Sequence, residues 1–290
     1  MKYTQKPRNS GDAHPHDRVA VVDIETHAPT YEGDDFPVWP LHRPICASIL
    51  TADRDDLGVV GFSLTTILFP GRETKALADL ELLLSDRVIV TFNGRGFDLP
   101  VLALTAMKHR KFDTPNLSNL SRANRYGGQH CDLADQFSQY GSARGASLAT
   151  LCAALDISVK QNAHGDEVSR LYDSGEIETI KKYCEEDVAA TYLLFLHWIA
   201  FRHSDQELLV TGCAHLARFI ETEGLDHLLA HARYARTYWA HAELNKRMAA
   251  HLVRDLKIAA SRQIGRSSLG IIGDDDEGSS DDDDDDQLPF

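Results

Sequence analysis

Two acidic residues follow the first apolar run of the chain at a spacing that lets them act together. The run covers residues 19–22, and Asp23 and Glu25 stand on either side of Ile24. An apolar run of this kind predicts a buried strand, in which residues two apart point to the same face. Two neighbouring carboxylates repel each other and resist desolvation. The pair therefore predicts that a cation binds between the two side chains.

Two more acids could complete such a site. Asp98 begins a predicted helix, where an aspartate is often only an N-cap. Asp187 lies four residues after Tyr183 on another predicted helix, hence on the same face, and a surface salt bridge is the alternative role for it. Four carboxylates are hard oxygen ligands that suit Mg²⁺ or Mn²⁺. Two such ions about 3.5–4 Å apart can clamp the attacking and leaving oxygens of a phosphoryl displacement, which is the predicted chemistry.

A mixture of strand and helix patterns must position these acids. The strands are expected at 18–25, 43–50, 56–64 and 87–92, and the helices at 73–85, 97–110, 147–157 and 177–201. Ser147 is expected to cap the third of these helices. Strands followed by helices indicate an α/β fold in which a mixed sheet is flanked by helices.

The remainder of the chain is expected to be helical and then disordered. Helical patterns cover 205–221 and 225–262, and residues 233–266 hold eight Lys or Arg against two acids. That basic stretch is either a solvated helix face or a phosphate-binding surface. We predict a flexible leader at 1–16, a first domain at 17–203, a helical extension at 204–268 and a disordered acidic tail at 269–290.

Composition limits the partners and the compartment. The net charge is −14, but ten acids at 274–277 and 281–286 account for most of it, which leaves −4 for residues 1–270. A nearly neutral body does not argue against a nucleic-acid partner. No apolar run is long enough to span a membrane, and the N-terminus lacks an apolar signal core. The five scattered cysteines contain no C-x-x-C pair and are expected to be reduced, so a cytoplasmic protein without a membrane partner is predicted.

Three segments in order carry a resemblance to a known group. The segments VVDIET, TFNGRGFDLPVL and YCEEDVAATYLL resemble the three motifs of the DEDD 3′–5′ exonuclease superfamily, which has a ribonuclease H-like fold. The resemblance is closest to predicted exonucleases related to the proofreading domain of family-B DNA polymerases. It covers about residues 17–203 and implies that this part is a 3′–5′ exonuclease domain.

The resemblance also implies roles for the five motif residues. Asp23, Glu25 and Asp187 would bind the metal that activates water. Asp23 would also touch a second metal, which Asp98 would hold directly or through water. The superfamily divides into a branch with His five positions before the last Asp and a branch with Tyr four positions before it, and this chain has Tyr183 there. Tyr183 would therefore hydrogen-bond the attacking water.

Other positions match the same group but have structural alternatives. Asn93 and Phe97 could contact the terminal nucleotide, Phe97 by stacking, or they could form a turn and part of the core. His130 and Asp132 also match, and they could equally be structural.

The last residues resemble the acidic tip of bacterial single-stranded-DNA-binding proteins. An aspartate run precedes an apolar end, and the residues of interest are Asp284, Asp285, Asp286, Leu288, Pro289 and Phe290. This resemblance implies docking to proteins that read the authentic tip. The alternatives are that the tail acts as a DNA decoy on the chain's own basic helices, or that it only solubilises the chain.

The two resemblances together imply one function. The chain would be a metal-dependent 3′–5′ exonuclease that releases 5′-nucleoside monophosphates from the 3′ end of single-stranded DNA in repair, replication or recombination. Its cofactors would be two Mg²⁺ or Mn²⁺ ions. An exoribonuclease acting on RNA, and a non-catalytic adaptor that binds a 3′ end and presents the acidic tail, are the alternatives.

Overall fold

A five-stranded mixed sheet forms the centre of the fold. The computed structural model describes residues 16–28, 37–159 and 165–268. The strands lie in the order β3-β2-β1-β4-β5. Their bounds are β1 Arg18–His27, β2 Arg43–Arg54, β3 Val60–Leu68, β4 Val88–Thr91 and β5 His130–Asp132. The first three strands pair antiparallel, whereas β4 and β5 run parallel to β1. This arrangement is the predicted ribonuclease H-like sheet.

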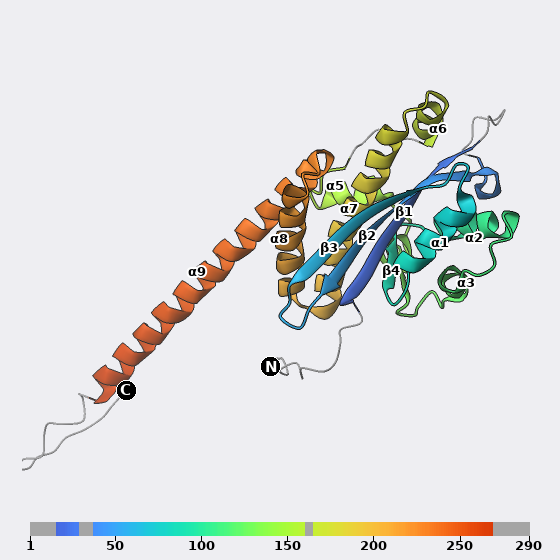
Figure 1. The fold of residues 1–290 in the computed structure, drawn as a ribbon. Coiled ribbons are helices and arrows are strands. Elements are labelled where there is room, and N and C mark those ends of the chain that lie inside the picture. Colours follow the sequence, from blue (N-terminus) through green and yellow to red (C-terminus); the bar gives the residue numbers. More distant parts are fainter. Residues whose placement is uncertain (1–15, 29–36, 160–164, 269–290) are drawn as a thin grey trace, which may run out of the picture. The chain divides into compact units, whose positions relative to one another are not determined.

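Helices cover both faces of this sheet (Figure 1). Those before β5 are α1 Glu73–Leu83, α2 Asp98–Lys108 and α3 Pro115–Arg122, with a short 3-10 turn η1 at Trp39–Leu41. Those after it are α4 Leu133–Phe137, α5 Leu148–Ala154, α6 Gly165–Asp173, α7 Ile177–His203, α8 Gln206–Thr222, the 3-10 turn η2 Asp226–Leu228 and α9 Leu229–Ser268. The mixed sheet flanked by helices is thus confirmed.

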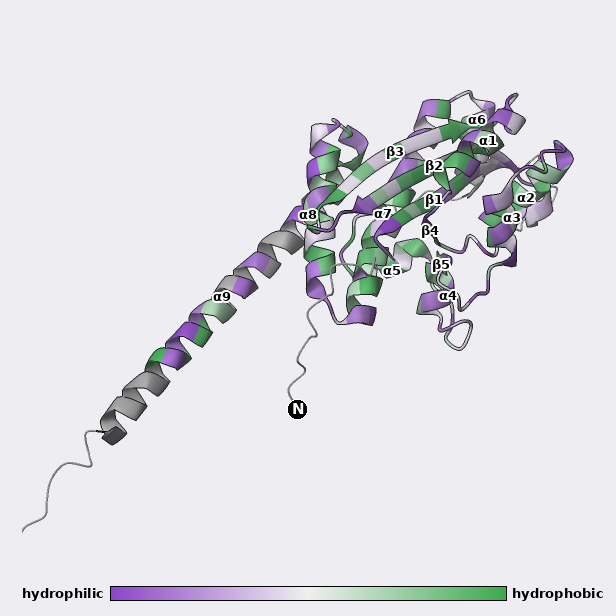
Figure 2. Cartoon of the chain, turned by 60° about the horizontal axis from the view of Figure 1, so that its bottom comes forward, coloured by the Kyte–Doolittle hydropathy of each residue, from purple (hydrophilic) through white to green (hydrophobic). Residues whose placement is uncertain are grey.

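Alternation along β1 divides the core into two layers. Val19 and Val21 pack in the cluster that contains the buried residues of α7 and α8, whereas Ala20 and Val22 pack in the cluster formed with α1, α2 and α3. Figure 2 shows hydrophobic residues along β1 and β2 and a mixture of hydrophobic and hydrophilic residues along α7. Val19 and Val21 therefore point to the side of the sheet that α7 covers, and the alternation continues to Glu25, where the register of the strand shifts.

Helix α8 packs within the same compact unit as the sheet. This unit covers residues 1–240, and residues 241–290 form a second unit. The Arg54 guanidinium at the end of β2 donates to Thr211 Oγ1 at 3.1 Å, and the Val60 N–H donates to His215 Nδ1 at 3.3 Å. The predicted division of the chain at residue 203 stays a prediction, although α8 is tied to the hairpin of β2 and β3 by these bonds.

Several local expectations can be compared with the structure. The side chain of Ser147 accepts the Thr150 N–H at 3.1 Å and caps α5 as predicted. All five cysteines are buried. Across the described parts of the chain, no helix is both long and apolar enough to cross a membrane. Residues 1–15 of the predicted leader, the acidic tail and its six proposed docking residues lie outside the described residues.

Candidate active site

The face of β1 that carries Asp23 and Glu25 is the one that α7 covers. Both residues continue the odd-numbered positions, whose earlier members Val19 and Val21 pack with α7 residues such as Val188. Asp187 precedes Val188 on that helix, and α7 contacts both β1 and β2. The strand alternation and the helix position together direct three carboxylates toward one point.

These three carboxylates form a compact cluster. One oxygen each from Asp23, Glu25 and Asp187 lies within 4.8 Å of the other two, and all three residues are half-buried. The structure therefore brings together three of the four predicted metal ligands. They come from a strand and from a helix that begins more than 150 residues later in the chain.

Burial and mutual repulsion raise the proton affinity of this cluster. Loss of hydration raises the pKa of Asp23 well above its ordinary value, and the nearby charges of Asp98, Asp187 and Glu25 raise it further. The pKa of Glu25 is also raised, first by loss of hydration and then by Asp187. Like charges this close are unfavourable unless protons or a cation compensate them.

Asp98 lies beside the cluster and is fixed to β1. It is buried as the first residue of α2, and its Oδ1 accepts the backbone N–H of Ile24 at 3.2 Å. This amide is available because β4 ends at Thr91, which leaves β1 without a parallel partner after Val21. Asp98 is thus more than a helix cap. Its pKa is raised to about 7, chiefly by loss of hydration and also by the Asp132 and Asp187 charges, against the opposing effect of backbone hydrogen bonds.

Tyr183 lies one helical turn before Asp187 on α7 and is half-buried. Cys184, which follows Tyr183 on α7, contacts Asp23 and was not among the predicted site residues. Its thiol donates to the backbone carbonyl of Asp23 at 3.4 Å and lies 3.6 Å from Asp23 Oδ2. Cys184 stands three positions before Asp187, so its helical spacing was the available signal.

A second missed residue, Glu185, ties α7 to its surroundings. Its Oε1 accepts the hydroxyl of Thr66 on β3 at 2.6 Å, and its Oε2 lies 2.7 Å from His227 Nε2. The hydrogen bond and the ion pair lower the pKa of Glu185, against the opposing effect of lost hydration. Glu185 therefore fixes α7 two residues before Asp187. Nothing in the sequence distinguishes this acid from its neighbour Glu186.

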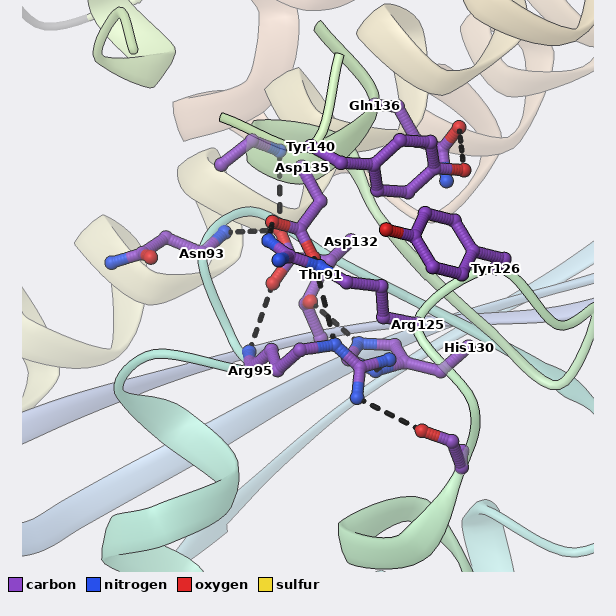
Figure 3. Close-up of polar contacts among 12 residues, drawn as sticks. Thr91, Asn93, Arg95, Arg125, Tyr126, His130, Asp132, Asp135, Gln136 and Tyr140 are labelled. Carbon is purple, nitrogen blue, oxygen red and sulfur yellow. Dashed lines mark hydrogen bonds and ion pairs between the residues drawn. The ribbon is translucent and has the colours of Figure 1, made fainter. Parts of the chain in front are cut away.

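The loop that leads into Asp98 is held by the edge strand β5 (Figure 3). Asp132 accepts backbone N–H groups of Asn93 and Arg95, and the Arg95 guanidinium lies 3.2 Å from His130 Nδ1. His130 Nε2 in turn lies 2.9 Å from the Thr91 hydroxyl at the end of β4. His130 and Asp132 thus have structural contacts that support the loop.

The two predicted substrate contacts, Asn93 and Phe97, border this loop. Asn93 is exposed and has a left-handed backbone with φ of 60°, which fits a turn residue. The Phe97 ring is partly buried against the α1–α3 layer and meets the His42 ring edge to face at 4.9 Å. Their contacts fit the structural alternatives, and their contact with substrate stays a prediction.

The donor set fits a divalent metal ion. Three hard carboxylates converge within 4.8 Å, and the pKa values of Asp23 and Glu25 are raised by lost hydration and by the charges of the neighbouring carboxylates. A hard cation with oxygen ligands would remove this repulsion.

Comparison with protein-family models finds a match over most of this chain. The model of a family described as "Predicted 3'-5' exonuclease related to the exonuclease domain of PolB" matches residues 34–236, which is 203 of the 290 residues. This chain belongs to that family. The PolB-related exonuclease match contains Asp98, Tyr183 and Asp187, whereas Asp23 and Glu25 precede the matched segment.

Solved structures include distant likenesses to this PolB-related exonuclease. One is the family B DNA polymerase of the hyperthermophilic archaeon Pyrobaculum calidifontis, with 17% identity over 78% of this chain and 29% of the polymerase, at a TM-score of 0.45. A second is E. coli Exonuclease I with a dT13 oligonucleotide, with 16% identity over 63% of this chain and 44% of that chain, at a TM-score of 0.35. A third is an ExoI/SSB-Ct complex, with 16% identity over 62% of this chain and 44% of that chain, at a TM-score of 0.35. The chain thus spans less than half the length of these structures.

Proposed function

We propose that this exonuclease-family chain removes 5′-nucleoside monophosphates from the 3′ end of single-stranded DNA, in repair, replication or recombination, with two Mg²⁺ or Mn²⁺ ions. The observation that carries the proposal is the convergence of Asp23, Glu25 and Asp187 within 4.8 Å on the α7 face of β1. Asp98 beside them supplies the fourth carboxylate. When bound, the divalent ions would lower the pKa of a water molecule and neutralise charge on the phosphate.

Each residue has a definite task in this proposal. Asp23, Glu25 and Asp187 would hold one ion, and Asp23 with Asp98, whose position is fixed by the Ile24 N–H, would hold the second. Tyr183, one turn from Asp187, orients the attacking water through its hydroxyl. Because no side-chain base is needed, the phenol serves to position the water and does not remove its proton.

The closing test of this function is a time course on a 5′-labelled single strand. Wild-type chain with Mg²⁺ or Mn²⁺ should give a ladder that shortens from the 3′ end and disappears with EDTA. Asp187→Asn should lower the rate by on the order of 10³-fold or more. The control Asp56→Asn removes an exposed acid from the loop between β2 and β3 and should keep full activity. No ladder from the wild type would overturn the proposal.

A matched RNA strand identifies the substrate class. Faster loss of DNA supports the proposal, and faster loss of RNA would replace it with the exoribonuclease alternative. Binding of 3′ ends with no cleavage of either strand would instead support a non-catalytic adaptor. The experiment thus distinguishes a DNA exonuclease, an exoribonuclease and a non-catalytic adaptor.

The acidic segment 281–290 is proposed as a docking element. Its support is its sequence, an aspartate run followed by Leu288, Pro289 and Phe290. A basic-rimmed apolar pocket on a partner suits both parts of such a segment. Deleting 281–290 should leave intrinsic activity unchanged and abolish binding to a protein that reads the single-stranded-DNA-binding-protein tip. A rise in activity at low salt would instead indicate a DNA decoy, and no change in either measurement would contradict docking.

A further inference from the structure

A cavity separate from the carboxylate cluster lies between the end of α7 and the loop before β5. Its volume is about 250 Å³, and three aromatic side chains, Tyr126, Tyr140 and Trp198, line it together with Arg202. Three histidines, His16, His130 and His203, complete its polar wall. Within the part of the chain that the structure describes, no Asp or Glu lines this cavity. The Arg202 charge in a wall without acids favours an anionic ligand.

Two of the three aromatic rings of this pocket lie beside arginines, of which Arg125 is ion-paired with Asp135. The rings of Tyr126 and Tyr140 meet at a centroid distance of 4.5 Å and an angle of 66° (Figure 3). The Tyr140 ring lies 5.7 Å from the Arg125 guanidinium, and the Trp198 ring lies 5.6 Å from that of Arg202. Tyr126 is 69% exposed, so its ring is accessible to a ligand. Flat rings beside guanidinium groups are the surfaces on which bases stack and to which phosphates bind.

We propose that this pocket binds a nucleobase together with its neighbouring phosphate. Tyr126 and Trp198 supply the stacking surfaces, and Arg202 supplies the positive charge. The proposal rests on the nucleic-acid substrate proposed above. Two sources share this chemistry: an upstream nucleotide of the strand under degradation, and a free nucleotide released from it.

The place of the pocket in the fold favours the upstream strand. Trp198 follows Asp187 by eleven residues on α7, which is a separation of about 17 Å along a helix. This length corresponds to about five stacked nucleotides at about 3.4 Å each. Short strands held at the carboxylate cluster would therefore not reach the pocket, whereas longer strands would.

The length dependence gives a direct test by binding without cleavage. In an Asp187→Asn background with EDTA, fluorescence anisotropy compares a labelled dT12 with a labelled dT3. The double variant Tyr126→Ala, Arg202→Ala should weaken dT12 binding by roughly five- to a hundredfold, the range expected from one lost stacking contact. Binding of dT3 should be unchanged. The matched control Phe112→Ala, Arg218→Ala removes an exposed aromatic and an exposed cation outside the pocket, and should bind as the parent does. Binding of dT12 by the pocket variant within twofold of the parent would overturn the proposal.

Tryptophan fluorescence distinguishes the two sources. Trp39→Phe with Trp239→Phe leaves Trp198 as the single tryptophan of the chain. Quenching by dT12 but not by dTMP supports the strand site, and quenching by both at similar concentrations supports a nucleotide site. Quenching by neither overturns the pocket. These readouts are independent of cleavage. If the wild type is active and the pocket variants bind dT12 as the parent does, only the pocket proposal is refuted. If the chain binds the strand but gives no cleavage ladder, only the proposed function is refuted.

Discussion

The carboxylate of Asp132 holds the backbone of Asn93, whose N–H it accepts at 2.8 Å. The same carboxylate accepts the Arg95 N–H at 2.9 Å and the Ala134 N–H at 3.1 Å. A buried side chain on the edge strand thus satisfies three amides, two of which belong to the loop that ends at Asp98. The position of the fourth carboxylate of the proposed site therefore depends on β5.

Asp132→Ala should lower activity even though Asp132 acts only by supporting the loop that leads to Asp98. The change leaves the amides of Asn93 and Arg95 without their acceptor, which should cost about 1–3 kcal/mol of stability. The rate should fall by about 10–100-fold because Asp98 loses its support. Steady-state kinetics well below the melting temperature check this. Asp113→Ala, an exposed acid in the loop before α3, is the control and should leave the rate unchanged.

Gly94→Ala should test the same loop through sterics. A Cβ at this position would lie 2.6 Å from both Cβ and Oγ1 of Thr91, which is fully buried. Overpacking of this kind costs about 1–3 kcal/mol, and thermal unfolding should show a lower Tm. Gly145→Ala adds a methyl group where nothing lies within 4 Å and should leave Tm unchanged. Equal Tm values for the two variants would contradict the packing described for this loop.

Asp23→Asn should stabilise the chain without metal and remove the stabilisation that metal gives. The raised pKa of Asp23 means that its ionised form is unfavourable in the folded state. Removing that charge should raise Tm in EDTA by about 2–4 °C, the shift that about 1 kcal/mol gives in a chain of this size. Added Mn²⁺ should raise Tm of the wild type but not of the variant. Scanning fluorimetry with and without Mn²⁺ checks both, and an equal response to Mn²⁺ would argue against the site.

His231 should make the fold sensitive to acid. It is buried on α9, and neither ring nitrogen has a hydrogen-bond partner among the described residues. Loss of hydration, together with the neighbouring His227, lowers its pKa to about 4. The unfolded chain binds the proton at its ordinary pKa of about 6.5, so stability should fall as pH drops from about 6.5 to about 4.

Replacing this histidine should reduce the acid sensitivity. His231→Leu should remove up to about 1.4 kcal/mol per pH unit from the slope of unfolding free energy in that window. Urea unfolding at pH 7.0, 6.0 and 5.0 gives the slope. His251→Leu replaces an exposed histidine and should keep the wild-type slope. A slope unchanged in His231→Leu would show that other groups carry the pH dependence.

The sequence predicted the elements that carry strong patterns. The strand at 18–25 corresponds to β1, the helix at 177–201 to α7, and the start of the helix at 97–110 to α2. The strand expected at 56–64 lies instead at Val60–Leu68. It was displaced because Asp55 accepts the N–H groups of Leu57 and Val59 in a turn with Gly58 at φ of 81°. The turn that Asp55 and Gly58 form therefore delayed the start of the strand, despite the apolar residues Leu57 and Val59.

Other parts of the fold and the site had no local signal. β5 has only three residues, too few for an alternating pattern, and yet it carries His130 and Asp132. The strand order and the face that α7 covers depend on contacts between distant segments. The site acids could be proposed from the motifs. The hydrogen bond from the Ile24 N–H to Asp98 depends on β4 ending at Thr91, and the thiol of Cys184 beside Asp23 depends on the packing of α7 against β1.

The wide separation of Asp23 and Asp187 along the chain has a consequence during protein synthesis. The two residues are 164 positions apart, and α7 delivers the second only after it packs on the sheet. A chain emerging from the ribosome folds from its N-terminal end, and contacts of such long range form late. The nascent chain therefore carries Asp23 and Glu25 for most of its translation without a complete carboxylate cluster. The proposed active site is therefore complete only after α7 has been made and has packed on the sheet.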